Sequence, residues 1–183
     1  EKMLANKGSV YHEPYVAVRL PFRVAEETPT CFEAIHPAYL PYVHQQKAFE
    51  RLTGDDGRST LVATGTGSGK TECFLYPILE YCHRHRGERG IKALIIYPMN
   101  ALATDQAKRI AELIYGSDEL RGNVTVGMYV GGQEHTPART MSEHGVITDH
   151  ETMLNNAPDI LMTNYKMLDY LLVRPKDALL WQD

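Results

Sequence analysis

The nine residues from Ala63 to Thr71, which read Ala-Thr-Gly-Thr-Gly-Ser-Gly-Lys-Thr, constrain the fold of this chain more than any other segment. They follow a β-like run at 59–62 and precede a helix-like run at 72–75. A glycine-rich loop between a strand and a helix is the context of a phosphate-binding P-loop. Its glycines let several backbone N–H groups point at one anion, and the helix N-terminus adds partial positive charge. The segment therefore predicts a phosphate-binding site.

Two residues of this loop have predicted chemical roles. Lys70 is expected to reach the β- and γ-phosphates of a nucleotide, and the hydroxyl of Thr71 is expected to ligate Mg²⁺. These are the predicted catalytic residues, and Thr71 is the predicted metal ligand. Thr64 stands where the P-loop pattern has its first glycine. The loop residues predicted to bind the nucleotide are Thr66, Gly67, Ser68, Gly69, Lys70 and Thr71.

The composition is typical of one soluble globular domain. Of the 183 residues, 43% are hydrophobic and 23% are charged, so the chain can bury a sizeable core. The formal net charge of -4 gives no overall sign of nucleic-acid binding, so any such surface must be local. The three cysteines lack metal-ligand spacing, and no apolar run is long enough to cross a membrane. These features predict a cytoplasmic location and no membrane partner.

Short apolar runs alternate with helix-like segments along most of the chain. Runs that do not alternate apolar and polar residues are typical of parallel strands covered on both faces. The pattern predicts an α/β fold with a doubly wound parallel sheet, whose strand-end loops share one ligand-binding edge. The expected strands are Thr60–Ala63, Ala93–Tyr97, Val124–Val130 and Asp159–Thr163, and the expected helices are Val43–Leu52, Lys70–His85, Ala101–Tyr115 and Lys166–Val173.

The chain divides into two regions of different character. Residues 1–38 are irregular, with four prolines and a β-like piece at 16–20, and are predicted to be an accessory lead-in. Residues 39–183 are predicted to form the nucleotide-binding domain, with a polar loop and one short helix within 131–156. The chain begins with Glu1 rather than Met, which favours a fragment of a longer protein.

Gln45 lies upstream of the P-loop in a helix-like segment. Its amide offers one acceptor and two donors, which suits the N6 donor and N7 acceptor of adenine. Guanine replaces the N6 donor by an O6 acceptor. The residue is therefore predicted to read adenine, and a surface glutamine on a helix is the alternative.

Three further segments follow predicted strands. At Pro98 a buried strand stops and a helix begins, and the N-terminus of that helix can hold a phosphate of a polynucleotide backbone. The pair Gly131-Gly132 permits close backbone approach, or is a plain turn. Thr163 and Asn164 have the character of a helix cap, and could equally present donors to a phosphate.

Taken in order, these patterns resemble the first motor domain of superfamily 2 helicases of the DEAD/DEAH-box type. The resemblance covers about residues 40 to 175. Gln45 with Ala48 matches the Q motif, Thr64–Thr71 matches motif I, Pro98–Gln106 matches motif Ia with Met99 where Thr is usual, Gly131-Gly132 matches motif Ib, and Thr163-Asn164 matches a later strand-end motif that touches the nucleic-acid backbone.

This resemblance implies the RecA-like fold of P-loop NTPases, with ATP and Mg²⁺ as cofactors. It implies a nucleic-acid partner, DNA in preference to RNA, and a second RecA-like domain in the same polypeptide. The wording at 97–102 and 163–172 is similar to large bacterial helicases with a C-terminal domain of unknown function, some of which belong to antiphage defence systems such as Druantia. The implied nucleic-acid-binding residues are Pro98, Asn100, Gly131, Gly132, Thr163 and Asn164.

The Asp-Glu box of the family, which completes Mg²⁺ binding, is not found in this sequence. No Asp-Glu-x-Asp or Asp-Glu-x-His string occurs, and the box is expected on a strand after Asp183. Because positioning and charge neutralisation supply most of the catalysis in phosphoryl transfer, the fragment alone is expected to be inactive.

The leading interpretation is the ATP-binding part of an ATP-dependent helicase or translocase. A duplex translocase or restriction-type motor subunit that does not unwind, and a non-catalytic ATP-binding scaffold module, are the alternatives. A small-molecule kinase would leave Gln45 and the strand-end segments without a role.

Overall fold

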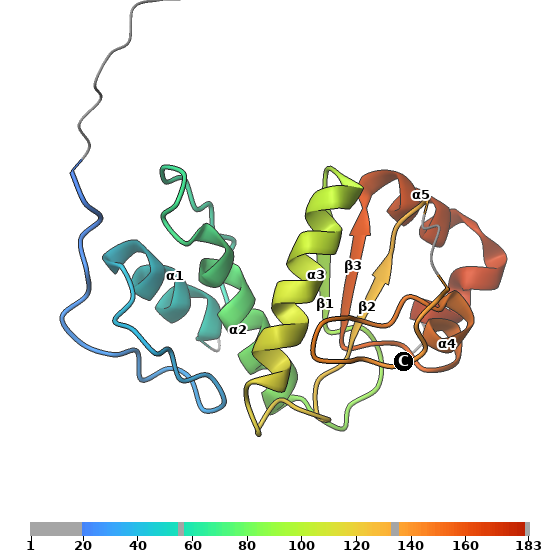
Figure 1. The fold of residues 1–183 in the computed structure, drawn as a ribbon, viewed down its shortest axis with the longest axis horizontal. Helices are drawn as coiled ribbons and strands as arrows, with labels where there is room; N and C mark the ends of the chain where they lie inside the picture. Colours follow the sequence, from blue (N-terminus) through green and yellow to red (C-terminus); the bar gives the residue numbers. More distant parts are fainter. Residues whose placement is uncertain (1–19, 55–56, 133–135, 182–183) are drawn as a thin grey trace, which may run out of the picture.

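The computed structural model describes residues 20–54, 57–132 and 136–181. Its sheet has three parallel strands in the order β1-β3-β2, and Figure 1 shows them side by side behind a long helix. Strand β1 spans Ala93–Tyr97, β2 spans Val126–Tyr129 and β3 spans Ile160–Asn164. Each strand begins or ends within two residues of its predicted boundary, and parallel pairing confirms the predicted arrangement.

Helices connect and flank these strands, as the alternating pattern predicts. The four long helices lie within one residue of their predicted boundaries, and one short helix lies inside the predicted polar loop. They are α1 (Val43–Thr53), α2 (Lys70–Arg84), α3 (Asn100–Tyr115), α4 (His150–Asn155) and α5 (Tyr165–Val173), followed by the 3₁₀ helix η1 (Pro175–Trp181).

Two apolar cores pack on the opposite faces of β3, because successive strand side chains point in opposite directions. On β3, Ile160 and Met162 join a core that includes α2 and α3, whereas Leu161 joins the side chains of α4, α5 and η1. All five residues of β3 are buried. Helices on both faces of a parallel sheet make this a doubly wound α/β fold, consistent with a RecA-like domain.

The strand predicted at Thr60–Ala63 is wrong. Residues 57–65 have no regular secondary structure, and Leu61 is 91% exposed. A strand needs a neighbouring backbone to accept and donate its hydrogen bonds. In the described part of the sheet, β1 pairs with β3 alone, so the segment before the P-loop has no strand beside it.

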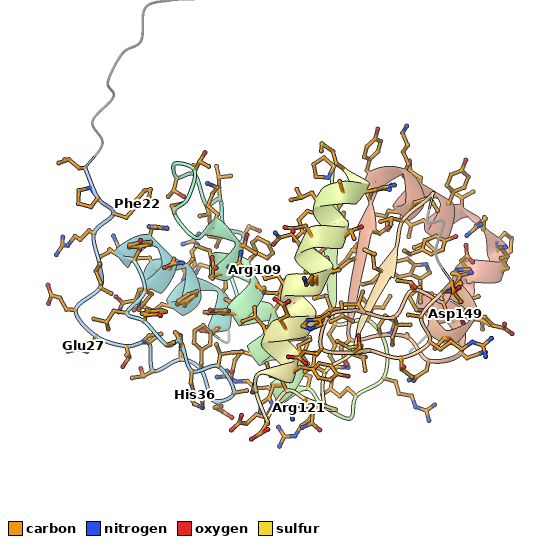
Figure 2. The ribbon with its side chains drawn as sticks, in the orientation of Figure 1. Phe22, Glu27, His36, Arg109, Arg121 and Asp149 are labelled. Carbon is orange, nitrogen blue, oxygen red and sulfur yellow. The ribbon has the colours of Figure 1, made fainter. Side chains whose placement is uncertain are left out.

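The described part of the lead-in, residues 20–38, packs on the first two helices rather than extending away from them. Figure 2 labels Phe22, Glu27 and His36 along its path past α1. Its Phe32 ring packs edge-on against Phe49 of α1 at 5.0 Å between centroids. The β-like piece predicted at 16–20 lies outside the described residues except for Leu20, which is irregular.

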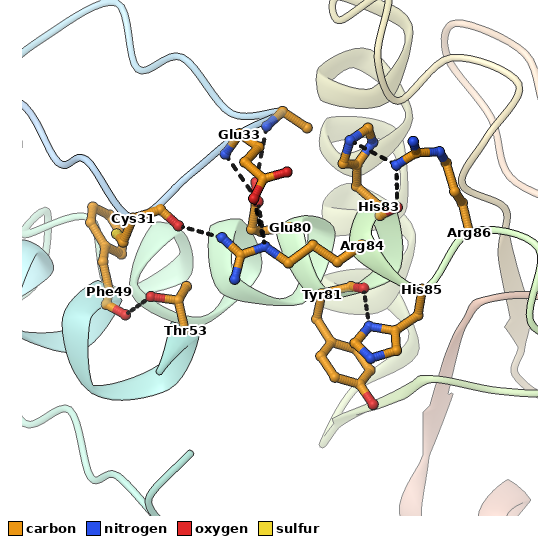
Figure 3. Close-up of polar contacts among 11 residues, drawn as sticks. Cys31, Glu33, Phe49, Thr53, Glu80, Tyr81, His83, Arg84, His85 and Arg86 are labelled. Carbon is orange, nitrogen blue, oxygen red and sulfur yellow. Dashed lines mark hydrogen bonds and ion pairs between the residues drawn. The ribbon is translucent and has the colours of Figure 1, made fainter. Parts of the chain in front are cut away.

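Glu80 of α2 anchors this lead-in from below (Figure 3). Its carboxylate, 1% exposed, accepts the backbone N–H groups of Glu33 at 3.0 Å and Ala34 at 3.1 Å. Arg84, one turn later, pairs with the same carboxylate at 2.9 Å and donates to the carbonyl of Cys31. One buried acidic side chain thus ties the lead-in to the helix that follows the P-loop.

We expect Glu80→Ala to lower the free energy of unfolding by about 3–5 kcal/mol, because two backbone donors and one guanidinium lose their buried acceptor. Urea denaturation of the chain measures the loss. Glu50→Ala, on the exposed side of α1, is the control and should change it by less than about 0.5 kcal/mol. Equal losses in the two variants would contradict the anchoring role.

Candidate nucleotide and nucleic-acid site

Glycine is required at the end of the P-loop for two reasons. Gly69 has φ of 71°, in the left-handed region that side chains rarely adopt. A Cβ on this residue would also lie 2.4 Å from Nε2 of Gln45, closer than any real contact. Gly67, with φ of 78°, supplies the other left-handed position in the loop. The loop can therefore close tightly against α1 only with these glycines.

Two consecutive residues at the start of α1 hold the carbonyl groups of the loop. Nε2 of His44 lies 2.8 Å from the carbonyl oxygen of Ser68, and Nε2 of Gln45 donates to the carbonyl of Gly69 at 3.0 Å. In a trans peptide the carbonyl and the following N–H point in opposite directions. Fixing these two carbonyls against α1 therefore turns the N–H groups of Gly69 and Lys70 away from α1, as an anion-binding loop requires.

Gln45 itself is oriented by a second hydrogen bond. Its Oε1 accepts the backbone N–H of Tyr42 at 2.8 Å, so the amide nitrogen must face the P-loop. The residue is buried, at 8% exposed. This burial contradicts the alternative of a surface glutamine on a helix, and the structure brings Gln45 directly to the P-loop.

The remaining loop residues occupy distinct positions. Lys70 donates from Nζ to the carbonyls of Thr64 at 3.1 Å and Gly65 at 2.8 Å. An ammonium group has three donors, so a phosphate could exchange with these carbonyls. Ser68 is fully buried and its hydroxyl lies 2.6 Å from that of Thr64, which leaves its backbone as the group available to a ligand. Thr66 is exposed at the turn, and Thr71 lies in the first turn of α2.

A cavity of about 490 Å³ opens beside the loop. One wall is formed by residues 37–42, at the end of the lead-in and before α1, and the other by the loop and α2. Gln45, Glu72 and Tyr76 line it together with Gly67 and Gly69. Aromatic side chains beside hydrogen-bonding groups are typical of a site for a planar base.

Glu72 is a polar wall residue that the sequence reasoning missed. One of its carboxylate oxygens pairs with Arg109 of α3, which Figure 2 labels. The position of Glu72 directly after the P-loop threonine was the available signal that it lies near the site. Its partner Arg109 could not be found in this way, because it lies 37 residues away in the sequence.

Burial raises the pKa of the neighbouring Cys73 thiol and of the Tyr76 hydroxyl, and the negative charge of Glu72 raises both pKa values further.

The strand-end residues meet at the carboxyl edge of the sheet, where α3 also begins (Figure 1). Asn100 donates from Nδ2 to the carbonyl of Gly131 at 2.7 Å, and its Oδ1 accepts from Nδ2 of Asn164 at 2.7 Å. Asn164 also caps α5 by accepting the N–H of Met167. The first residue of α3 therefore joins the three predicted nucleic-acid-binding segments.

The other predicted strand-end residues differ in accessibility. Pro98 and Gly132 are exposed, and Gly132 has φ of 77°. Thr163 is fully buried, and its hydroxyl donates to the carbonyl of Tyr129 at 2.6 Å. The Thr163 side chain therefore supports the edge from within the sheet, while Asn100 and Gly132 lie at its surface.

A family model described as DEAD/DEAH box helicase matches residues 42–181. This chain belongs to that family. The match confirms the resemblance drawn from the motif order, and it starts directly before the α1 residues that hold the P-loop.

Individual relatives support the same assignment. The Druantia protein DruE of Escherichia coli (strain UMEA 4076-1) is 28% identical over 74% of this chain and 12% of its own length. DEAD-box ATP-dependent RNA helicase 29 of Oryza sativa subsp. indica is 26% identical over 79% of this chain and 17% of its own. The uncharacterized ATP-dependent helicase YprA of Bacillus subtilis (strain 168) is 30% identical over 63% of this chain and 15% of its own. The chain thus spans less than a fifth of each relative.

In the part of the chain that the structure describes, no helix combines the length and apolar character needed to cross a membrane.

We expect Asn100→Ala to weaken binding of a single-stranded oligonucleotide about tenfold, because losing two hydrogen bonds of about 0.5–1.5 kcal/mol each uncouples the strand-end segments. Fluorescence anisotropy at constant salt measures the affinity. Asn123→Ala is the matched control, since the Asn123 side chain donates to the local carbonyl of Glu119, in the turn before β2. An unchanged affinity in Asn100→Ala would remove this network from the binding surface.

Proposed function

We propose that this chain is the ATP-binding part of a nucleic-acid-dependent helicase or translocase. The proposal rests on the geometry of the P-loop. His44 and Gln45 contact the carbonyl groups of Ser68 and Gly69, and Nζ of Lys70 donates to the carbonyl of Gly65 in the same loop. Family membership supports ATP as the nucleotide and a nucleic acid as the partner. ATP binding and hydrolysis would then be coupled to movement on, or unwinding of, the nucleic acid.

The loop residues fit the phosphates of ATP. Gly67 and Gly69 leave space where side chains would intrude, and the N–H groups at the start of α2 add the partial charge of a helix N-terminus. Lys70 would exchange its two loop carbonyls for oxygens of the terminal phosphates. Its positive charge would offset the negative charge that builds up on those oxygens during phosphoryl transfer.

The fit to Mg²⁺ rests on one residue of this chain. Mg²⁺ prefers oxygen ligands and is usually held by one or two carboxylates together with phosphate oxygens. Thr71 can supply a hydroxyl oxygen, and the described residues contain no cluster of three or more potential acidic, histidine or cysteine ligands. When bound, the ion would neutralise phosphate charge, and the carboxylates of an Asp-Glu box elsewhere in the polypeptide would complete its ligands.

The nucleic acid is proposed to lie along the carboxyl edge of the sheet, in contact with the segments joined by Asn100. Contacts from backbone groups and a helix N-terminus would read phosphates rather than bases. Binding should therefore be largely independent of sequence and should weaken with salt. DNA is our preferred partner over RNA, and the relatives include both a Druantia protein and RNA helicases.

We further propose that the motor acts in antiviral defence, and the Druantia relative supports this. We also propose that the protein is cytoplasmic and that a second RecA-like domain lies elsewhere in the same polypeptide. A duplex translocase that does not unwind would use the same site, and a strand-displacement assay separates the two. A scaffold that binds ATP without hydrolysing it would show no nucleic-acid-stimulated turnover.

We expect Lys70→Ala to weaken MgATP binding to this chain at least tenfold, since the main cationic contact with the terminal phosphates is lost. In the gene product that contains this chain, less than about a tenth of the ATPase rate should remain, which corresponds to about 1.4 kcal/mol of barrier. Isothermal titration and a phosphate-release assay measure the two quantities. Lys176→Ala, at an exposed position of η1, is the control. Undiminished ATP binding in Lys70→Ala would refute the assignment.

A further inference from the structure

The Glu72 carboxylate has one partnered and one unpartnered oxygen. Oε1 pairs with the guanidinium of Arg109. Oε2 is shielded from solvent and has no hydrogen-bond partner among the described residues. A buried acceptor without a donor costs about 1–3 kcal/mol, and more when it is charged. The free energy of such an oxygen falls when a donor is brought to it.

The unpartnered oxygen lies beside the amide nitrogen of Gln45. A Cβ built on Gly69 would meet Nε2 of Gln45 at 2.4 Å and Oε2 of Glu72 at 3.0 Å, so both atoms border the same point. Both residues line the cavity next to the P-loop. The absence of a side chain on Gly69 is therefore what allows an amide donor and a carboxylate acceptor to come together there.

The donor and acceptor roles of these two groups are fixed by their other contacts. The Tyr42 N–H holds Oε1 of Gln45, so the amide presents its nitrogen, with one N–H on the Gly69 carbonyl and the second still available. The Arg109 guanidinium holds Oε1 of Glu72, so the carboxylate presents Oε2. One donor and one acceptor therefore border the same point beside the cavity.

Adenine presents the complementary pair. Its N7 accepts a hydrogen bond and its 6-amino group donates one. Guanine has acceptors at both N7 and O6, so its O6 would face the Glu72 carboxylate without a proton between them. We infer that Glu72 determines base specificity in this site: Oε2 accepts a hydrogen bond from the 6-amino group of adenine while Gln45 donates to N7. This inference rests on the proposed function, in which the chain binds ATP.

The first test uses the unmodified chain and changes only the nucleotide. Dissociation constants are measured by titration with MgATP, MgGTP and the Mg²⁺ complex of purine riboside triphosphate, which lacks the 6-amino group. ATP should bind at least tenfold more tightly than either of the others, because each leaves the buried carboxylate oxygen without a donor. Equal binding of ATP and purine riboside triphosphate would overturn the inference, and this arm does not depend on any variant folding.

The second test compares two variants that break the same ion pair from opposite sides. In Glu72→Gln, Arg109 should hold the amide oxygen, so the amide NH₂ faces the base and the preference for ATP over GTP should fall at least tenfold. In Arg109→Gln the carboxylate remains, and the preference should stay within about threefold of the unmodified chain. An equal fall in both variants, or no fall in Glu72→Gln, would show that Glu72 serves only the ion pair between α2 and α3.

Two further measurements separate the failure modes. If Oε2 instead accepts a ribose hydroxyl, 2′-deoxy-ATP will bind the unmodified chain more weakly than ATP and the purine base will not matter, which contradicts the inference. If no nucleotide binds the unmodified chain, the proposed function fails and the inference fails with it. If ATP binds in a Lys70-dependent way but ATP, GTP and purine riboside triphosphate bind equally, the proposed function stands and the Glu72 assignment alone is refuted.

Discussion

The hydrogen bond from Gln45 to the carbonyl of Gly69 is the contact on which the candidate site depends. It requires a glycine at position 69, because a Cβ would lie 2.4 Å from the amide nitrogen and clash with it. It also fixes the direction of the loop peptides, so that their N–H groups turn toward a phosphate. In this chain the Q-motif glutamine is therefore part of the P-loop architecture as well as a candidate reader of the base.

This dependence gives α1 and the lead-in a larger role than that of a flanking segment. Helix α1 packs along α2, and the buried carboxylate of Glu80 ties residues 33 and 34 to the same helix. The far wall of the cavity is formed by residues 37–42. A substitution that displaces the lead-in would thus also displace the wall of the proposed nucleotide cavity, because both are held by α2 and α1.

A second set of contacts joins the proposed nucleotide site to the proposed nucleic-acid edge. Arg109 lies on α3 and pairs with Glu72 at the start of α2, while Asn100 at the start of the same α3 holds the strand-end segments. One rigid helix therefore carries a contact to each site. The two proposed sites are therefore joined through side-chain contacts of the same helix.

The sequence by itself determined the elements whose signals are local. Four long helices and three strands could be placed because each carries a local apolar pattern, and the roles proposed for Gly69-Lys70-Thr71 rest on adjacent residues alone. The strand predicted at Thr60–Ala63 failed because an apolar run becomes a strand only beside another backbone. The tertiary structure alone decided that Glu72 meets Arg109, that Glu80 holds the lead-in and that the Thr163 hydroxyl points into the sheet. These contacts join residues more than 30 positions apart, and no local pattern encodes which distant partner a buried polar group will find.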